Sequence, residues 1–115
     1  MKLDIDTMEV AADRAAEFLK SLGNRHRLLI LCQLLDGERS VGDLVDFLGI
    51  RDSTVSQHLA LLRREGLVAA RRDGQTIWYS LNSDPVRDVL AALYRAFCAP
   101  EGPTPALRRR QSRIG

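Results

Sequence analysis

Small polar side chains gather on one side of a predicted helix in the middle of the chain, and their types suit contact with DNA bases. Between residues 52 and 65, Val55, Leu59 and Leu62 recur at helical spacing and predict a buried stripe. The rest of the helix offers short hydrogen-bonding groups where a solvated helix usually carries Glu and Lys: Ser53, Thr54, Ser56 and Gln57. Gln can pair with adenine, and Ser or Thr can bond several base edges. The pattern therefore predicts a helix that enters the major groove, with these side chains at bases or nearby phosphates.

Basic residues near this helix are candidate contacts to the DNA backbone. We expect His58 and Arg63 to reach phosphates from the helix, and Arg71 and Arg72 to do so from a following hairpin. His58 has a second interpretation, because it lies near the edge of the buried stripe and could simply pack there. The two hairpin arginines could likewise be ordinary residues of a solvated surface.

The residues before this helix predict its partner in a helix-turn-helix. Ser40 to Asp43 resembles a capping box that opens a short helix, and Gly49 lies in the turn that follows. We expect Asp52 to cap the central helix. A generic helical hairpin would share this turn, so the polar outer face is what favours a helix-turn-helix over about 40–65.

A β-hairpin is predicted directly after the helix-turn-helix. Residues 67–72 and 76–81 have strand character, and Asp73-Gly74 between them is a strong hairpin turn. A basic hairpin in this place corresponds to a wing, over about 67–81.

Three further helices are predicted around this unit. The first, about 6–22, opens with a capping box at Asp6, and the second starts at Asn24 and is apolar nearly all round, as a central buried helix would be. The last, about 85–98, starts at an Asp84-Pro85 pair. Apolar stripes on the first and last helices suggest a homodimer seam, although packing within one chain would leave the same stripes. The predicted fold is mainly α with a β-hairpin wing: four helices, two strands and a final helix.

Length and composition agree with one small globular domain. The chain has 115 residues, of which 45% are hydrophobic. We expect one domain over 1–98 and a disordered basic tail over 99–115. The chain shows no signal peptide and no long apolar run, so we expect a cytoplasmic protein without membrane contact. Net charge is only +2, but residues 51–80 carry five basic and three acidic groups, as a localised DNA contact would require.

The most specific motif is the run from Ser56 to Arg63, which has the form Ser-x-His-Leu-x-x-Leu-Arg. Further parts of the same pattern are residues 22–28, 48–50 and 66–68 and Tyr79. With these parts the chain resembles the ArsR/SmtB family of winged-helix repressors over roughly residues 8–98. The resemblance implies a homodimer, joined through its first and last helices, that represses transcription by binding double-stranded operator DNA.

Metal sites of that family can be compared position by position. Its arsenic and cadmium type has Cys-x-Cys before the recognition helix, where this chain has Ser40 and Gly42. Its zinc type has Asp and several His on the last helix, which here carries Asp84 and Asp88 but no His. Two scattered His and two Cys do not easily form a closed tetrahedral site within one protomer. We therefore expect no metal and no cofactor.

Two cysteines remain as candidate sensors. From the residues alone, Cys32 shares a stripe with leucines and is predicted to be a small buried hydrophobe, whereas Cys98 should be partly accessible. The residues around them, at 30–32, 37–41 and 94–98, are similar to the sulfide- and persulfide-responsive SqrR/BigR group of the family. This resemblance implies a dithiol switch. Reactive sulfur species would join Cys32 to Cys98 through a disulfide or polysulfide link, release the DNA and induce sulfide-detoxification genes.

Two other functions stay open at this point. A metal- or peroxide-responsive repressor could use the same thiols, with zinc shared across a dimer. A winged helix can also serve as a protein-interaction module. The sequence has no evident cluster of acid, base and nucleophile, so we do not expect an enzyme.

Overall fold

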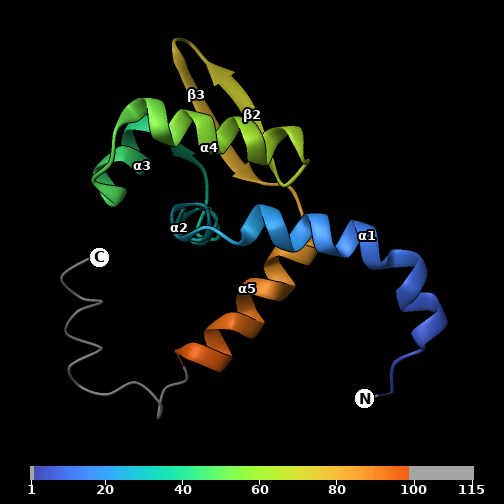
Figure 1. Ribbon diagram of the computed structural model, residues 1–115. Helices are drawn as coiled ribbons and strands as arrows, with labels where there is room; N and C mark the ends of the chain where they lie inside the picture. The colour runs from blue at the N-terminus through green and yellow to red at the C-terminus, as the bar shows by residue number, and fades with distance from the viewer. Residues whose placement is uncertain (1, 99–115) are drawn as a thin grey trace.

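The computed structural model describes residues 2–98. Five helices and three strands follow one another in the order α1 (Ile5–Leu22), α2 (Arg25–Leu34), β1 (Arg39–Ser40), α3 (Val41–Leu48), α4 (Asp52–Arg64), β2 (Val68–Asp73), β3 (Thr76–Leu81) and α5 (Asp84–Phe97). The architecture is a winged helix-turn-helix and confirms the predicted fold class (Figure 1). The predicted tail, 99–115, lies outside the described residues.

The start of α1 differs from the predicted one. Asp4 is the cap, and its carboxylate accepts hydrogen bonds from the backbone N–H groups of Asp6 and Thr7. The predicted capping box at Asp6 is therefore wrong, because an acidic side chain already caps the helix two residues earlier. Asp6 lies instead in the first turn, where its charge is favourable for the helix dipole.

Two later helix starts also differ by one residue. The Ser83 hydroxyl accepts from the backbone N–H of Val86 and caps α5, so Asp84 belongs to the first turn. Arg51 precedes α4 without a capping side-chain bond, and Asp52 is its first helical residue. In both cases the acidic residue lies inside the helix rather than before it.

The capping box of α3 is confirmed. The Ser40 hydroxyl accepts from the backbone N–H of Asp43, and the Asp43 carboxylate accepts from the backbone N–H of Ser40. Both interactions satisfy N–H groups that a helix start leaves without partners.

The hairpin turn lies one residue later than predicted. Asp73 still pairs with Thr76, so Gly74 and Gln75 form the two-residue turn, and Gly74 supplies the positive φ of 65°. The strand β1 has no counterpart among the predicted elements. It pairs with β3, with Arg39 opposite Tyr79, and gives a sheet in the order β1-β3-β2. Two residues are too short to show alternation, so no sequence pattern marks this strand.

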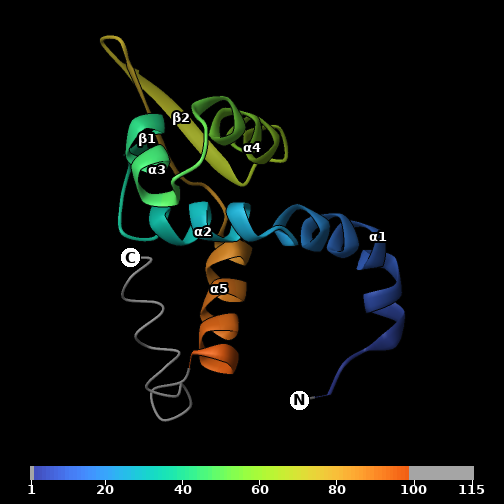
Figure 2. The same cartoon turned by 60° about the vertical axis from the view of Figure 1, so that its left-hand side comes forward.

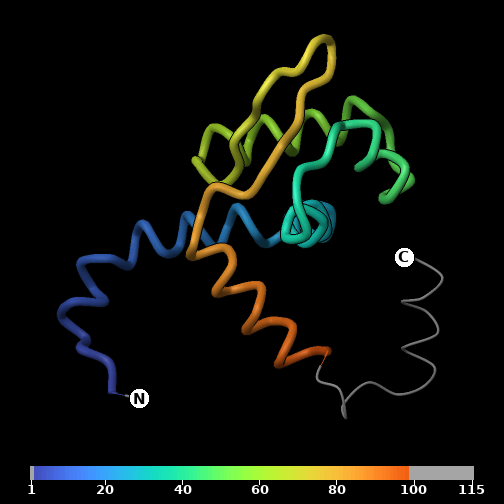
Figure 3. Tube along the Cα trace, turned by 180° about the vertical axis from the view of Figure 1, so that it is seen from behind, coloured from blue at the N-terminus to red at the C-terminus, as the bar shows by residue number. Residues whose placement is uncertain are grey.

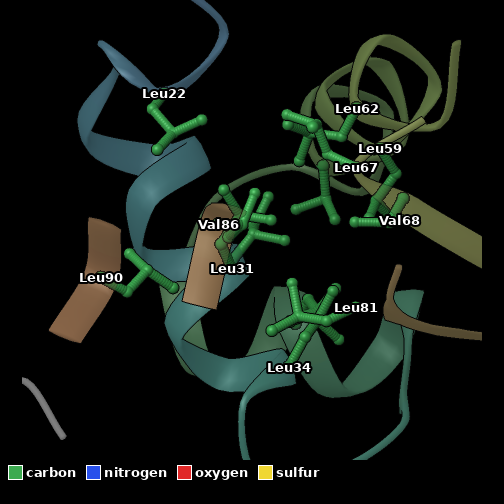
Figure 4. Packing of buried hydrophobic residues seen from close by; sticks show 13 residues of the cluster. Leu22, Leu31, Leu34, Leu59, Leu62, Leu67, Val68, Leu81, Val86 and Leu90 are labelled. Carbon is green, nitrogen blue, oxygen red and sulfur yellow. The ribbon is translucent and has the colours of Figure 1, made fainter. Parts of the chain in front are cut away.

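The core forms where α2 crosses beneath α4 and the sheet. Ile30 and Leu31 of α2 are fully buried, which confirms the predicted central role of this helix. Figure 4 shows Leu59 and Leu62 of α4 packed against side chains from the strand that follows and from α2. Fully burying one such side chain contributes about 1.5–3 kcal/mol. This packing holds α4 in a fixed orientation.

Parts of α1 and α5 extend away from this core. Figure 2 shows both helices leaving the body of the molecule in different directions, and Figure 3 shows the same from behind, with the hairpin projecting at the opposite end. All residues from 2 to 17 are exposed. The radius of gyration is 15.9 Å, whereas a compact chain of about 100 residues has roughly 13 Å. Within residues 2–98, no helix combines the length and the apolarity needed to cross a membrane.

Candidate nucleic-acid interface

The turn between α3 and α4 depends on one glycine. Gly49 ends α3 with φ of 70°, and its backbone N–H donates to the carbonyl of Val45. A left-handed residue at this position reverses the chain at low steric cost only when it is Gly. The turn brings α4 across α3 and exposes one side of α4.

The inner side of α4 is buried as its sequence predicts. Val55, Leu59 and Leu62 have no exposed surface. Since these three residues fix which side points inward, the remaining side must face outward.

The outer side of α4 presents the predicted polar residues. Ser53, Ser56 and Gln57 are exposed, and Thr54 is half-buried. The Ser56 hydroxyl donates to the Asp52 carboxylate at 3.4 Å, while hydrogen bonds to other protein groups are not seen for Gln57 within residues 2–98. A side chain that is exposed and uncommitted in this way can bond a base edge without first giving up a protein partner.

The two wing arginines have different surroundings. Arg71 donates from Nε and Nη2 to the two carboxylate oxygens of Glu38, each at 2.8 Å. The Arg71 guanidinium lowers the pKa of Glu38, and the Glu38 carboxylate raises the pKa of Arg71. Arg72, one residue on, is exposed, and the described part of the chain holds no ion pair for it. The structure thus leaves Arg72 free in the wing and commits Arg71 to an ion pair.

Arg63 and His58 differ in their exposure to solvent. Arg63 is exposed in the last turn of α4. His58 is half-buried, and its Nδ1 lies 3.4 Å from Nη1 of Arg27. Burial, then the charge of Arg27 and then that of His26, lower the pKa of His58. His58 is therefore held in its neutral form around pH 7.

Both cysteines are free thiols. Cys98 is half-buried, as predicted, but Cys32 is exposed, so the expectation of a buried Cys32 is wrong. It lies on the side of α2 that also leaves Leu35 exposed. Neighbouring atoms still remove part of the water around its sulfur. This desolvation, with a smaller effect from Cys98, raises the pKa of the Cys32 thiol.

The two positions at which metal-binding relatives have Cys-x-Cys are not arranged as a metal site. Ser40 caps α3, Gly42 is exposed, and residues 2–98 contain no group of three or more His, Cys, Asp or Glu side chains arranged to hold a metal ion.

Two contacts of candidate site residues were missed by sequence reasoning. The Glu38–Arg71 pair and the Arg27–His58 contact join residues 33 and 31 positions apart. No local spacing rule links residues so distant. The available signal is weak, because Arg27 is one of three basic side chains that open α2 and only its place next to the apolar run distinguishes it.

A helix-turn-helix with a polar outer helix face and a following β-hairpin defines the winged-helix class of DNA-binding proteins. A family model described as bacterial regulatory protein, arsR family, matches residues 24–70. The chain belongs to the ArsR family, as the extent of its similarity to other members shows.

Three relatives illustrate that similarity. The chain is 44% identical over 96 residues to the transcriptional activator HlyU of Vibrio cholerae, covering 84% of this chain and 89% of the relative. It is 42% identical over 100 residues to the biofilm growth-associated repressor of Agrobacterium fabrum, covering 87% and 86%. The crystal structure of the transcriptional repressor BigR from Xylella fastidiosa superposes with a TM-score of 0.80 at 39% identity, covering 84% of this chain and 99% of that one. The relatives are transcriptional regulators, which are not enzymes.

Proposed function

We propose that the protein is a homodimeric transcriptional repressor of the cytoplasm that binds operator DNA and releases it when reactive sulfur links Cys32 to Cys98. The observation that carries the DNA-binding part is the polar side of α4, exposed next to the hairpin while the apolar side is fully buried. In this proposal Ser53, Thr54, Ser56 and Gln57 lie at bases or nearby phosphates. His58, Arg63, Arg71 and Arg72 contact the backbone.

Pairing of two chains is supported by the apolar residues that α1 and α5 leave uncovered. Ile5 of α1 is 70% exposed, and Phe97 of α5 is 71% exposed. Other large apolar side chains exposed on these helices are Met8, Val10, Leu19 and Tyr94. Helices whose apolar residues reach solvent gain stability by covering them. A symmetric pair of chains would cover them and present two α4 helices to successive half-sites of the DNA, about one helical turn apart.

The sulfur switch is supported by the placement of the two thiols. Both are free and reach solvent, as reaction with a dissolved persulfide donor requires. A persulfide donor RSSH transfers its outer sulfur to one cysteine thiol and leaves as the thiol RSH. The second thiol then attacks the cysteine sulfur of this new persulfide, forms the Cys–S–S–Cys link and expels hydrogen sulfide. A further sulfur transfer before closure lengthens the bridge. Such a link ties α2 to the end of α5 and changes the spacing of the paired DNA-binding helices.

A binding experiment tests the DNA part. Duplexes enriched from a random pool by the wild-type protein are labelled, and anisotropy is measured at several salt concentrations. We expect Gln57→Ala to weaken the free energy of binding to the enriched duplex by roughly 1–3 kcal/mol and to change binding to a scrambled duplex little. Arg72→Ala should weaken both and lower the salt slope by about one, while Arg87→Ala on α5 serves as the matched control. Absence of both enrichment and salt dependence would contradict DNA binding and favour an interaction module.

A second experiment tests the switch. Wild type, Cys32→Ser and Cys98→Ser are treated with glutathione persulfide or peroxide, then analysed by intact mass and by anisotropy on the enriched duplex. We expect persulfide to link the thiols and release DNA only in the wild type. A formed link with unchanged affinity overturns the switch. Release by peroxide alone, or zinc in the purified protein, favours the peroxide or metal alternative.

A further inference from the structure

The guanidinium of Arg27 joins three helices. Its Nε donates to the carbonyl of Ser21 at 2.6 Å, and its Nη2 donates to the carbonyl of Lys20 at 3.3 Å. Both carbonyls lie in the last turn of α1, where helical carbonyls lack partners within the helix. A cation at this end also interacts favourably with the helix dipole. From α2, Arg27 therefore caps the end of α1.

The remaining arm of Arg27 reaches the DNA-binding helix. Its Nη1 lies 3.4 Å from Nδ1 of His58 on α4. Guanidinium has donors only, so Nδ1 must be the acceptor in this contact. A neutral imidazole that accepts at Nδ1 carries its proton on Nε2. One hydrogen bond thus selects the tautomer of His58.

The other ring nitrogen of His58 remains available. No protein partner for Nε2 is seen within residues 2–98, and Nε2 is not among the buried polar atoms without a partner. The group therefore meets solvent. As an N–H donor on the DNA-binding helix, it matches a phosphate oxygen of the backbone.

We propose that Arg27 is a positioning residue for DNA binding: it holds His58 as the Nε2–H tautomer, ready to donate to a phosphate, and ties α4 to the last turn of α1. This inference rests on the proposed DNA-binding function. It also gives a physical route by which displacement of α1 would reach α4, since the same guanidinium holds both helices. Arg27 itself needs no contact with DNA.

The charged groups around His58 set its pH dependence. On α2, Arg27 and His26 lie against the ring, and the His26 ring centre is 5.9 Å away. Glu17 and Lys20 of α1, with Arg64 and Glu65 at the end of α4, line the hollow around Arg27. The pKa of His58 is lowered, so the protonated ring is disfavoured when the chain is folded. The contact is therefore fully present above the ordinary histidine pKa of 6.5 and is lost as pH falls through the lower pKa that His58 has in the folded chain.

The test measures the tautomer and DNA binding separately. Two-bond proton–nitrogen NMR spectra report the tautomer and the pKa of His58 in wild type, Arg27→Gln and the control Arg25→Gln, which changes an exposed arginine of the same helix. We expect the Nε2–H tautomer in wild type and in the control. In Arg27→Gln, both tautomers should appear and the pKa of His58 should rise. An unchanged tautomer and pKa in Arg27→Gln overturns the proposal.

DNA binding completes the test with His58 variants that keep Arg27. In His58→Asn the amide oxygen takes the place of Nδ1, and in His58→Gln the amide nitrogen takes the place of Nε2. We expect His58→Gln to retain more affinity than His58→Asn, because it retains the outward donor. Arg27→Gln and His58→Leu should each lower the affinity for the enriched duplex roughly tenfold, and the double variant should lower it little further. Additive losses, or His58 variants that bind normally while Gln57→Ala is impaired, refute the positioning role and leave DNA binding intact. If wild type fails to bind any duplex, the proposed function falls, and the spectra still decide the Arg27–His58 contact.

Discussion

At the scale of single residues, the ion pair between Glu38 and Arg71 bears on the proposed contact between the wing and DNA. Glu38 follows α2 and holds a side chain of β2 with two short hydrogen bonds. A phosphate that approaches Arg71 must therefore compete with a carboxylate already in place. The pair is exposed to water, so salt screens it, and its loss should alter binding more than stability.

Replacement of Glu38 tests that competition. We expect Glu38→Gln to raise affinity for the enriched duplex several-fold and to steepen the salt slope by about one charge, because Arg71 becomes free for a phosphate. Anisotropy against salt concentration measures both quantities. Asp36→Asn removes the same charge two residues before Glu38 and leaves the Glu38–Arg71 pair, so it provides the control; Asp73 is unsuitable because its carboxylate lies 4.0 Å from Arg71. Equal gains in affinity in the two variants would show a general charge effect. A lower affinity of Glu38→Gln than of wild type would show that the ion pair orients the wing.

Periodicity predicted the residues of α4 but not their partners. Helical spacing alone separates the buried Val55 and Leu59 from the exposed Ser53 and Gln57. The exposure of Cys32 was not predictable in the same way, because a leucine stripe on α2 does not show which of its sides another helix covers. The residues assigned to DNA remain predictions, since their exposure permits contact without demonstrating it.

At the scale of elements, the type and order of the five helices and the hairpin followed from local patterns. Local patterns did not predict where the helices begin, because several neighbouring side chains can cap the same helix. Asp4 and Ser83 take the caps expected at Asp6 and Asp84, and the hairpin turn moves to Gly74 and Gln75. The strand β1 exists only through its pairing with β3, which is a tertiary interaction and leaves no local signal.

At the scale of the whole molecule, the described chain is extended, with dimensions of 47 × 38 × 20 Å. Its core is confined to the region around α2, and the outer parts of α1 and α5 contribute few buried side chains. Sequence patterns predicted apolar stripes on these helices but could not distinguish a seam between chains from packing within one chain. The uncovered side chains of the structure favour the seam.

Charged substitutions on α5 test the pairing. We expect wild type to sediment as a dimer and Phe97→Asp to shift it towards monomer, because a carboxylate would be buried in the apolar seam. Ala92→Asp adds the same charge about 140° away around the helix and should remain dimeric. Sedimentation velocity measures the outcome, and anisotropy should show that the monomeric variant loses the enriched duplex. A monomeric wild type, or equal behaviour of the two variants, would contradict the seam.

The first half of α1 is uncovered, so under the proposed pairing its stability depends on the concentration of the protein in the cell. A helix of this length without neighbours is only marginally stable in water. Newly made chains that have not paired would fray at this end and be open to proteases. Paired chains would be protected, and the paired fraction rises with concentration. Under the proposed pairing and repression, occupancy of a promoter would rise faster than the rate of synthesis, so a modest change in expression would change repression strongly.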